Sequence, residues 1–398
     1  LEQSTGSFLV VLLGMFGYIA ALTVAAKIRV GRPLLKPVVD SGRLRWISLV
    51  AGVIGIVANF AVAFRVSEDY EGITTANFFV AFLHLSLIAA VASVLIRTRG
   101  KRSLDWWVIA VIISEFTFAM VQNSRMTVMD TFLSYIVTVA AFNARVSGRQ
   151  LAGIGVAVVV VVLITPIMLS VRDVRSELSW TQRIETTFNV VRNWRDAITA
   201  YEAWRDLSSA KNYLQYYGAP QNVLERMSLV NHVDVLKSGV DRTRQVGIED
   251  LGLAIEKVLP RVLSPEKPRG YSQSSWLYCE TGVYCSEAGF DTAPLVAHGY
   301  ASFGWVGVVV YPLLLGFPVL LLLKKSAGWN LSGNIWAVYL LLRVHNNFVE
   351  GGSDAYLIML LRELPQDLLL LLLISASVGV SALAMRGKRS QGSSPDGA

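Results

Sequence analysis

The chain alternates between long apolar blocks and short polar segments, except for one polar stretch from Val171 to His298. Leu151–Ser170 lies before it and Gly299–Leu323 after it, and both consist almost entirely of apolar residues. Each block has about 20 residues or more, enough to cross roughly 30 Å of hydrocarbon as a helix. The pattern predicts two membrane spans that flank a large polar segment, in which we expect the protein to act.

Further apolar blocks predict more spans, and the chain begins at Leu1 rather than at a methionine, so we expect about nine or more. The sequence thus predicts an all-α polytopic membrane protein with one large, mainly helical extracytoplasmic segment between spans six and seven. The nine predicted spans are Phe8–Ala26, Trp46–Phe64, Ala76–Ile96, Trp106–Val121, Thr127–Phe142, Leu151–Ser170, Gly299–Leu323, Asn334–Phe348 and Gln366–Met385.

Composition and charge support this class. Of the 398 residues 53% are hydrophobic and only 16% are charged, whereas soluble domains carry about 25% charged residues. The net charge of +7 does not indicate nucleic-acid binding, because the basic residues gather in Lys27–Arg45, Arg97–Arg102 and Lys324–Lys325, between apolar blocks. Basic loops of this kind are cytoplasmic, which predicts that the segment Val171–His298 is extracytoplasmic.

Four regions follow from this topology. Residues 1–170 hold spans one to six, residues 171–298 form the extracytoplasmic segment, residues 299–385 hold spans seven to nine, and residues 386–398 form a cytoplasmic tail. The tail is rich in Gly and Ser, so we expect it to be disordered. Within the external segment, Trp180–Ser208 and Val223–Lys237 space their apolar residues as helices do. Pro260, Pro265 and Pro268 exclude regular helix after them.

Cys279 and Cys285 are the only cysteines. An oxidising compartment permits a disulfide between them, and two free thiols are the alternative. Without adjacent histidines they make a poor zinc site. The sequence also lacks a P-loop, a dinucleotide-binding glycine pattern and an HExxH motif. We therefore predict no metal and no cofactor.

Arginines on the external side are candidates for binding a lipid diphosphate, because a planar guanidinium matches its oxygens and stays charged. Arg125 lies at the outer end of spans four and five, Arg226 on the predicted amphipathic helix and Arg261 in the proline-rich run. For each, a lipid headgroup contact or a solvated position is the alternative. We expect Arg242 and Arg244 to be solvated.

Histidines are the candidate bases, since their ordinary pKa is near neutrality. We expect His298 at the outer surface, where span seven begins. His232 follows Arg226 by six residues and so lies on another face of the same helix. An interfacial histidine without a task is the alternative for His298.

Ionisable residues inside spans are functional candidates by default. His84 falls in span three and Glu115 in span four. Arg343 and His345 fall in span eight, where we expect both to pair with Glu350 and hold the bundle together.

Several short motifs along the chain resemble those of the Wzy-type polysaccharide polymerases, which join oligosaccharide repeat units in bacterial envelopes. The resemblance covers about residues 120 to 310. The motifs are Asn123–Arg125 before a span, Glu225–Met227 followed by His232 and Asp234, Leu259–Arg261 with Pro265–Pro268, and Thr292 leading to Phe303–Gly307. Many relatives carry an acidic residue where this chain has His298, which leaves Glu225, Asp234 and Glu280 as further candidate bases.

The resemblance implies a GT-C-like glycosyltransferase of the bacterial inner membrane. Such an enzyme moves a growing glycan from one undecaprenyl-diphosphate carrier to a second lipid-linked oligosaccharide repeat unit. It implies that Arg125, Arg226, Arg261 and Lys267 bind the diphosphate and that His232 or His298 acts as base. The expected partners are the lipid-linked oligosaccharide, membrane lipids, a flippase and a chain-length regulator.

Three other functions stay open. An O-antigen ligase uses similar arginines and a histidine but a different acceptor. A transporter or flippase of lipid-linked glycans belongs to another class, although transporters often show pseudo-symmetric halves and no repeat is evident here. An envelope assembly protein would use the external segment for docking. The proline-rich run favours the polymerase.

Overall fold

The computed structural model of the protein describes residues 2–64, 79–122, 125–144, 148, 155, 180–196, 199, 229–259, 273–283, 285 and 293–391. Every regular element in these ranges is a helix. In chain order they are α1 (Glu2–Lys27), α2 (Ser41–Phe64), α4 (Phe82–Thr98), α5 (Trp106–Gln122), α6 (Arg125–Ala141), α8 (Trp180–Arg192), α11 (Leu229–Arg242), α12 (Glu249–Val258), α13 (Gln273–Glu280), α14 (Leu295–Tyr311), η3 (Pro312–Gly316), α15 (Phe317–Ala327), α16 (Ile335–Glu350), α17 (Ser353–Ile358), η4 (Met359–Glu363) and α18 (Leu364–Gln391).

Three helical segments in the described residues are long and apolar enough to cross a membrane: Thr5–Lys27, Ser41–Val62 and Leu295–Ala327. Shorter apolar helices occur in α4, α5, α6 and α16. For the described residues, the prediction of an all-helical chain with helices able to cross a membrane is confirmed. Nine spans stay a prediction, and the predicted span Leu151–Ser170 falls almost entirely outside the described residues.

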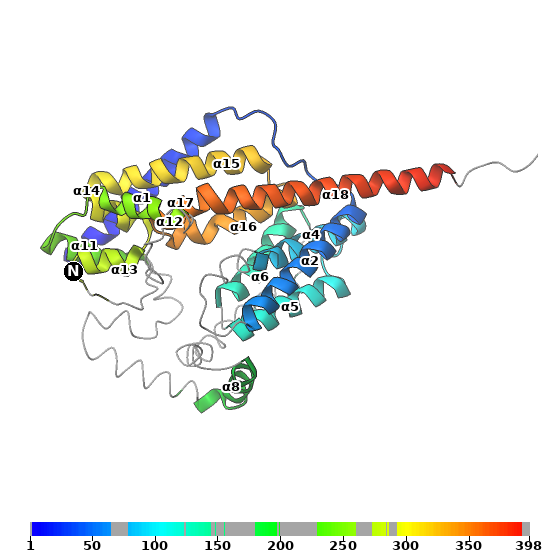
Figure 1. Ribbon diagram of the computed structural model, residues 1–398, viewed down its shortest axis with the longest axis horizontal. Coiled ribbons are helices and arrows are strands. Elements are labelled where there is room, and N and C mark those ends of the chain that lie inside the picture. The colour runs from blue at the N-terminus through cyan, green and yellow to red at the C-terminus, as the bar shows by residue number, and fades with distance from the viewer. Residues whose placement is uncertain are drawn as a thin grey trace, which may run out of the picture.

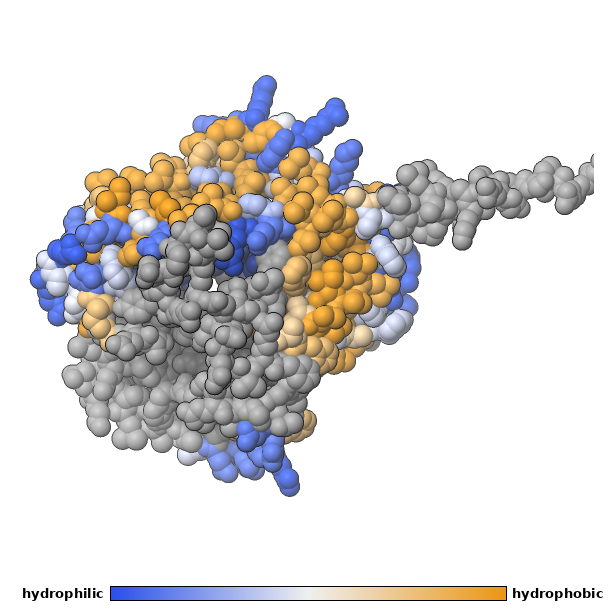
Figure 2. All heavy atoms as spheres, in the orientation of Figure 1, coloured by the Kyte–Doolittle hydropathy of each residue, from blue (hydrophilic) through white to orange (hydrophobic). Residues whose placement is uncertain are grey.

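The long apolar helices expose large hydrophobic side chains rather than hiding them. On α1, Phe8, Met15, Phe16 and Ile19 each leave more than half of their surface accessible. On the face drawn in Figure 2, apolar residues cover broad parts of the described surface, and hydrophilic side chains project at its edges. Such a surface is costly in water and is satisfied by lipid.

The helices form two groups that α16 and α18 join (Figure 1). One group contains α2, α4, α5 and α6, and the other contains α1, α14 and α15 together with the short helices α11, α12 and α13. A buried cluster connects the groups, with Phe82 of α4, Tyr311 of α14, Trp336 of α16 and Tyr356 of α17 among its largest members.

Glycines bring the helices of each group close together. A Cβ at Gly14 of α1 would come within 2.1 Å of a methyl carbon of Val296 in α14, and one at Gly17 within 2.7 Å of the Val309 carbonyl oxygen. Between α2 and α4, a Cβ at Gly55 would lie 2.6 Å from the Leu83 nitrogen. Small residues permit such backbone contacts, which supply the dispersion attraction that holds membrane helices together.

The predicted seventh span is interrupted. At Phe303 and Gly304 the backbone leaves the helical conformation, with φ +59° at Gly304. A straight helix rises 1.5 Å per residue, so it would hold Gly299 and Gly307 roughly 12 Å apart. In the structure their backbones are in contact, because a Cβ added at Gly307 would come within 1.9 Å of the Gly299 carbonyl oxygen. The first arm of α14 therefore folds back against the start of the second arm.

The segments that the sequence predicts to be cytoplasmic meet at one end of the bundle. Lys324 donates to the carbonyl oxygens of Ala25, Ala26 and Ile28 at 2.7–2.9 Å, which caps the end of α1. Arg45 and Arg97 both pair with Asp105, at 3.1 and 3.0 Å. The loops after α1, α4 and α15 therefore lie at the same end of the described bundle.

Some predicted boundaries were wrong. The last helix, α18, continues to Gln391, so the part of the predicted tail up to that residue is helical rather than disordered. The start of the third span, predicted at Ala76, lies outside the described residues. Its helix α4 continues to Thr98 rather than ending at Ile96, and Arg99 then takes the left-handed conformation. The helix predicted to end at Lys237 continues to Arg242, and its start at Val223 lies outside the described residues.

Candidate functional site

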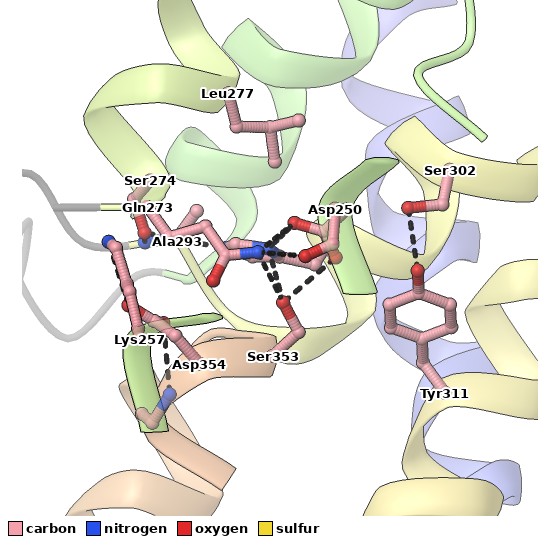
Figure 3. Close-up of polar contacts among 12 residues, drawn as sticks. Asp250, Lys257, Gln273, Ser274, Leu277, Ala293, Ser302, Tyr311, Ser353 and Asp354 are labelled. Atoms are coloured by element: carbon pink, nitrogen blue, oxygen red, sulfur yellow. Dashed lines mark hydrogen bonds and ion pairs between the residues drawn. The ribbon is translucent and has the colours of Figure 1, made fainter. Parts of the chain in front are cut away.

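Four helices bring a set of buried polar side chains together beside α14. Asp250 comes from α12, Gln273 and Ser274 from α13, His298 from α14 and Ser353 from α17, and each is at most 5% exposed. Figure 3 shows Gln273, Asp250 and Ser353 directed toward one another. Since isolated buried polar groups are costly, the hydrogen bonds among these five must hold the cluster together.

The Asp250 carboxylate is the centre of the cluster. Its Oδ1 accepts from Gln273 Nε2 at 2.6 Å and lies 2.8 Å from His298 Nδ1, and its Oδ2 accepts from Ser353 Oγ at 2.8 Å. Burial raises the pKa of the Asp250 carboxyl. The charge of His298 and the hydrogen bonds from His298, Ser353 and Gln273 have a larger, opposite effect, and they hold the pKa below its ordinary value. Asp250 is therefore a carboxylate at neutral pH.

An ionised Asp250 fixes the orientation of the His298 ring. A carboxylate can only accept, so the ring places its Nδ1 hydrogen toward Asp250 and leaves Nε2 as an acceptor when the ring is neutral. His298 Nε2 lies 3.3 Å from Ser274 Oγ. Ser274 Oγ already accepts from the backbone N–H of Ala293 at 3.0 Å, so its own hydrogen is available to Nε2.

The backbone at Gly352 supports the other side of the His298 ring. A Cβ at Gly352 would lie 2.4 Å from His298 Nε2 and 2.8 Å from Cε1, closer than any carbon normally comes. The glycine thus allows the loop between α16 and α17 to pack directly on the imidazole. This contact also brings Ser353 within 3.2 Å of His298 Nδ1.

A partly buried ion pair lies next to the cluster. Lys257 of α12 donates to Asp354 of α17 at 3.3 Å, and Figure 3 shows it beside Gln273 and Asp250. Burial lowers the pKa of the Lys257 ammonium, although Asp354 opposes the shift. The pair ties α12 to the start of α17, the two elements that supply Asp250 and Ser353.

The arrangement Asp250–His298–Ser274 can move a proton. A hydroxyl hydrogen donated to Nε2 can pass to the ring, and the adjacent carboxylate stabilises the imidazolium that then forms. The same order of groups activates serine nucleophiles in hydrolases. The hydroxyl that loses its proton is either that of Ser274 or that of a substrate in its place.

The position predicted for His298 was wrong in one respect. The sequence suggests an accessible histidine at the outer surface, but in the structure the side chain is fully buried. The reason is that α14 folds back at Phe303 and Gly304, which places His298 between α12, α13 and α17.

The other candidates of the external segment lie apart from the cluster. His232 is half-buried in α11, and the hydrogen bonds around Asp250 and His298 do not include it. Asp234 accepts from Ser7 Oγ at 2.6 Å and so joins α11 to α1. Glu280 pairs with the half-exposed Arg244 at 3.1 Å, which confirms that Arg244 is solvated. Arg242 is also exposed, as predicted.

The predicted diphosphate-binding residues are not placed by the structure. Arg125 begins α6, and nothing can be said of its side chain. Arg226, Arg261 and Lys267, with Glu225 and Pro260–Pro268, lie outside the described residues. Their assignment stays a prediction.

Cys279 and Cys285 form a disulfide, with their Cα atoms 4.5 Å apart. Cys279 belongs to α13, the helix that also supplies Gln273 and Ser274. The alternative of two free thiols does not apply. The bridge closes the chain over the end of α13 that lies away from the cluster.

The ionisable residues of the spans form pairs other than the one expected. Arg343 contacts Asp367 at 3.2 Å and Glu363 at 3.5 Å, and His345 contacts Asp130 at 3.2 Å, so the predicted pairing with Glu350 was wrong. α16 contacts α6 as well as the segment after α17, and these helices supply the nearer carboxylates. His84 and Glu115 lie 3.2 Å apart.

Sequence reasoning missed Asp250, Ser274 and Ser353. A usable signal was present in Gly351–Asp354, where two glycines, a serine and an aspartate interrupt the apolar sequence between two predicted spans. A glycine pair at such a point indicates close backbone approach. No local pattern marks Asp250 or Ser274, because their role depends on helices distant in the sequence.

No protein-family model, no curated protein and no solved structure matches this chain.

Proposed function

We propose that the protein polymerises undecaprenyl-diphosphate-linked oligosaccharide repeat units into an envelope or surface polysaccharide, on the extracytoplasmic side of the bacterial inner membrane. The observation that supports this proposal most directly is the buried series Asp250–His298–Ser274, in which His298 Nε2 faces a hydroxyl. Glycosyl transfer needs such a base, because the acceptor is a sugar hydroxyl. The sequence resemblance supplies the substrate class.

In the proposed reaction, an acceptor hydroxyl of one repeat unit attacks the anomeric carbon of the glycan on a second carrier. A carbon–oxygen bond forms there while the bond from that carbon to the diphosphate oxygen breaks. His298 Nε2 takes the hydroxyl proton, and Asp250 stabilises the resulting imidazolium. Undecaprenyl diphosphate leaves with the bonding electron pair. Without substrate, the Ser274 hydroxyl is the group next to His298 Nε2. In the proposed reaction the acceptor hydroxyl replaces it there.

The diphosphate needs positive charge as the bond breaks. We assign this role to Arg226, Arg261 and Lys267, with Arg125 at the start of α6. Each was selected from the sequence as a residue of the external side. No metal ion is required by this scheme, and a flippase and a chain-length regulator would supply the repeat unit and set the product length.

The direction of the helices favours an extracytoplasmic site. Ser353 and the glycines before it follow the end of α16, which begins beside the basic loops. The His298 cluster therefore lies toward the end of the bundle away from Lys324 and Arg45. With the basic loops in the cytoplasm, the cluster faces the compartment that holds flipped repeat units.

The experiment is complementation of a deletion strain of the native host, with variants produced at matched membrane abundance. Surface glycan is sized on gels. His298→Gln and Asp250→Asn should shorten the chains strongly, since loss of acid–base catalysis costs about 10²- to 10⁴-fold in rate. Glu249→Gln, an exposed neighbour of Asp250, is the control and should give normal chains.

The deletion phenotype separates the alternatives. Single repeat units capped on the surface support the polymerase. Complete loss of surface glycan, with long lipid-linked chains accumulating, would instead identify a ligase. Lipid-linked repeats trapped inside the cell would identify a flippase. Normal chains in both the His298→Gln and the Asp250→Asn strains would show that the cluster is not the catalytic site.

A further inference from the structure

A second polar site lies between α4, α6 and α16, away from the His298 cluster. It is a cavity of about 160 Å³, with His84 of α4, Asp130 and Ser134 of α6, and Tyr339 and Arg343 of α16 as its polar lining. Because each water position takes about 10–15 Å³ of such volume, the cavity has room for on the order of ten waters. A space of that size fits one sugar ring rather than several.

One lining group lacks a protein partner. Ser134 is 1% exposed, and its Oγ is buried with no hydrogen-bond partner among the described residues. Nearby, Glu115 of α5 is fully buried, and both of its carboxylate oxygens also lack a hydrogen-bond partner there, although Oε1 lies 3.2 Å from His84 Nδ1. Buried polar atoms are almost always paired in folded proteins, so the Ser134 hydroxyl, which lines the cavity, indicates a ligand with polar groups of its own.

The charges around the cavity exclude an anionic ligand. Four carboxylates gather there from four elements: Glu115, Asp130, Glu363 and Asp367. In the described part of the chain, the ion partners of these four carboxylates are Arg343, with a fixed positive charge, and the titratable His84 and His345. Even with both histidines protonated, the net charge is negative. A diphosphate would meet this field with repulsion.

A metal cation fits no better. Hard cations prefer a cage of oxygens, whereas Arg343 and the imidazole of His84 share this lining. No group of three or more His, Cys, Asp or Glu residues in the described part of the chain has the arrangement of a metal site. The lining instead combines donors and acceptors: two hydroxyls, a carboxylate, an imidazole and a guanidinium.

We propose that this cavity binds a neutral, polyhydroxylated ligand, one ring of a sugar, through Asp130, Ser134 and Tyr339. Adjacent sugar hydroxyls donate to the Asp130 carboxylate and accept from His84 and Arg343, which a mixed lining satisfies in both directions. The identification of this ring as part of the repeat unit rests on the proposed function. The site then separates the two parts of the substrate: sugar in this cavity, diphosphate at the arginines elsewhere.

The depth of the cavity in the bundle follows from the positions of its lining residues along α4, α6 and α16. α4 and α6 both end near the basic loops, where Asn143 donates to Ser332 at 3.4 Å and Ser93 to the Ser41 carbonyl oxygen at 2.8 Å. His84 lies in the first turn of α4, Asp130 in the first half of α6 and Ser134 just past its middle. Tyr339 is the fifth residue of α16, which begins at the basic-loop end, so the cavity lies between the two ends of the bundle.

The test measures binding to the purified full chain in lipid nanodiscs with two probes. One is the neutral oligosaccharide released by mild acid from the lipid-linked pool of the deletion host, and the other is undecaprenyl diphosphate. Ser134→Ala should weaken oligosaccharide binding about 2- to 10-fold, the effect of one hydrogen bond, and leave undecaprenyl diphosphate binding unchanged. Ser134→Val, which adds methyl groups toward the cavity, should weaken it further.

Ser114→Ala is the matched control, because Ser114 on α5 bonds its own helix at Ala110 and does not line the cavity. Thermal unfolding of each variant checks the fold. The sugar site is overturned if the wild type and both Ser134 variants bind the oligosaccharide with equal affinity. It is also overturned if the Ser134 variants lose undecaprenyl diphosphate binding in parallel, or if the wild type does not bind the oligosaccharide. The proposed polymerase is judged separately, by the glycan length of the host strains.

Discussion

Gly352 packs on the imidazole of the catalytic candidate His298 through its backbone alone. Its φ of −79° and ψ of −174° are open to any residue, so conformational freedom does not explain the glycine. The explanation is space, because a Cβ would lie 2.4 Å from His298 Nε2. A single methyl group at this position therefore tests the site without removing any of its polar atoms.

We predict that Gly352→Ala displaces the His298 ring. The variant should lose about 1–3 kcal/mol of stability, as is usual for overpacking, and should shorten the surface glycan in the complementation assay. The control is Gly252→Ala on α12, where nothing lies within 4 Å of the added Cβ and alanine is the better helix former. Gly252→Ala should be neutral or slightly stabilising. An equal loss in the two variants would contradict the close contact at Gly352.

Asp250 should give the protein an acid-labile stability. Its pKa is lowered in the folded state, so the carboxylate stabilises the fold fully above its unfolded pKa of about 3.9. This contribution is lost as pH falls below that value through the folded pKa. Thermal unfolding in detergent from about pH 6 down to about pH 3 should show the loss.

In Asp250→Asn the same scan should start from a lower melting temperature and fall less toward acid pH. Glu249→Gln serves as the control, because its carboxylate is half-exposed and pairs only at the surface with Arg244, where ion pairs contribute little. If Asp250→Asn and the wild type lost stability in parallel, the carboxylate would not be the group that titrates.

At the scale of the element, the two arms of α14 depend on each other. Gly299 and Gly307 pack backbone against backbone, and Tyr311 donates from its hydroxyl to Ser302 Oγ at 2.8 Å across the fold. Gly304, with its positive φ, makes the reversal between them. This turn is what carries His298 into the protein, so the helix and the site form together.

Gly307→Ala should therefore destabilise the protein by about 1–3 kcal/mol or more, since the Cβ would meet a carbonyl oxygen that cannot move independently. Gly316→Ala in η3 is the matched control in the same apolar segment. Its nearest neighbours are side-chain atoms of Tyr18 and Phe348 at 3.8–3.9 Å, an ordinary contact distance. Thermal unfolding compares the two, and similar melting temperatures would argue against the folded-back arm.

The disulfide acts on α13, which positions Ser274. Cys279 and Cys285 are six positions apart, and closing so short a loop should contribute about 2 kcal/mol. Reduction, or the double variant Cys279→Ser and Cys285→Ser, should lower the melting temperature equally. Thiol reagents should leave the non-reduced, denatured wild type unlabelled. Full labelling of that sample would show that the bridge is absent.

At the scale of the whole molecule, the sequence predicted the helices better than the site. Apolar blocks such as Phe8–Ala26 and Trp46–Phe64 lie within α1 and α2, because a long apolar run has few other stable forms. The fold-back at Gly304 was not predictable from an unbroken apolar block, and it is what buries His298. Asp250 and Ser353 are 103 positions apart, and only the packed helices bring them together.

The last prediction concerns how the bundle crosses the membrane. The loops after α1, α4, α6 and α15 share one end, where Gly333 donates to the Ala141 carbonyl oxygen at 3.0 Å and Lys324 caps α1. Reporter fusions at Gly100 and Gly333 should therefore give the same, cytoplasmic signal. A fusion at Gly218, in the long polar segment, should give the opposite one.

These fusions test two separate statements. Gly100 and Gly333 lie on different helical connections of the described fold, so opposite signals at these two positions would contradict the packing of the basic loops at one end. If the fusions at Gly100, Gly333 and Gly218 all gave the cytoplasmic signal, the packing of the basic loops at one end would stand, but the long segment would lie in the cytoplasm. Flipped repeat units are absent from that compartment. The polymerase proposal would then fail, while the His298 cluster would still need an explanation as a proton-transferring site.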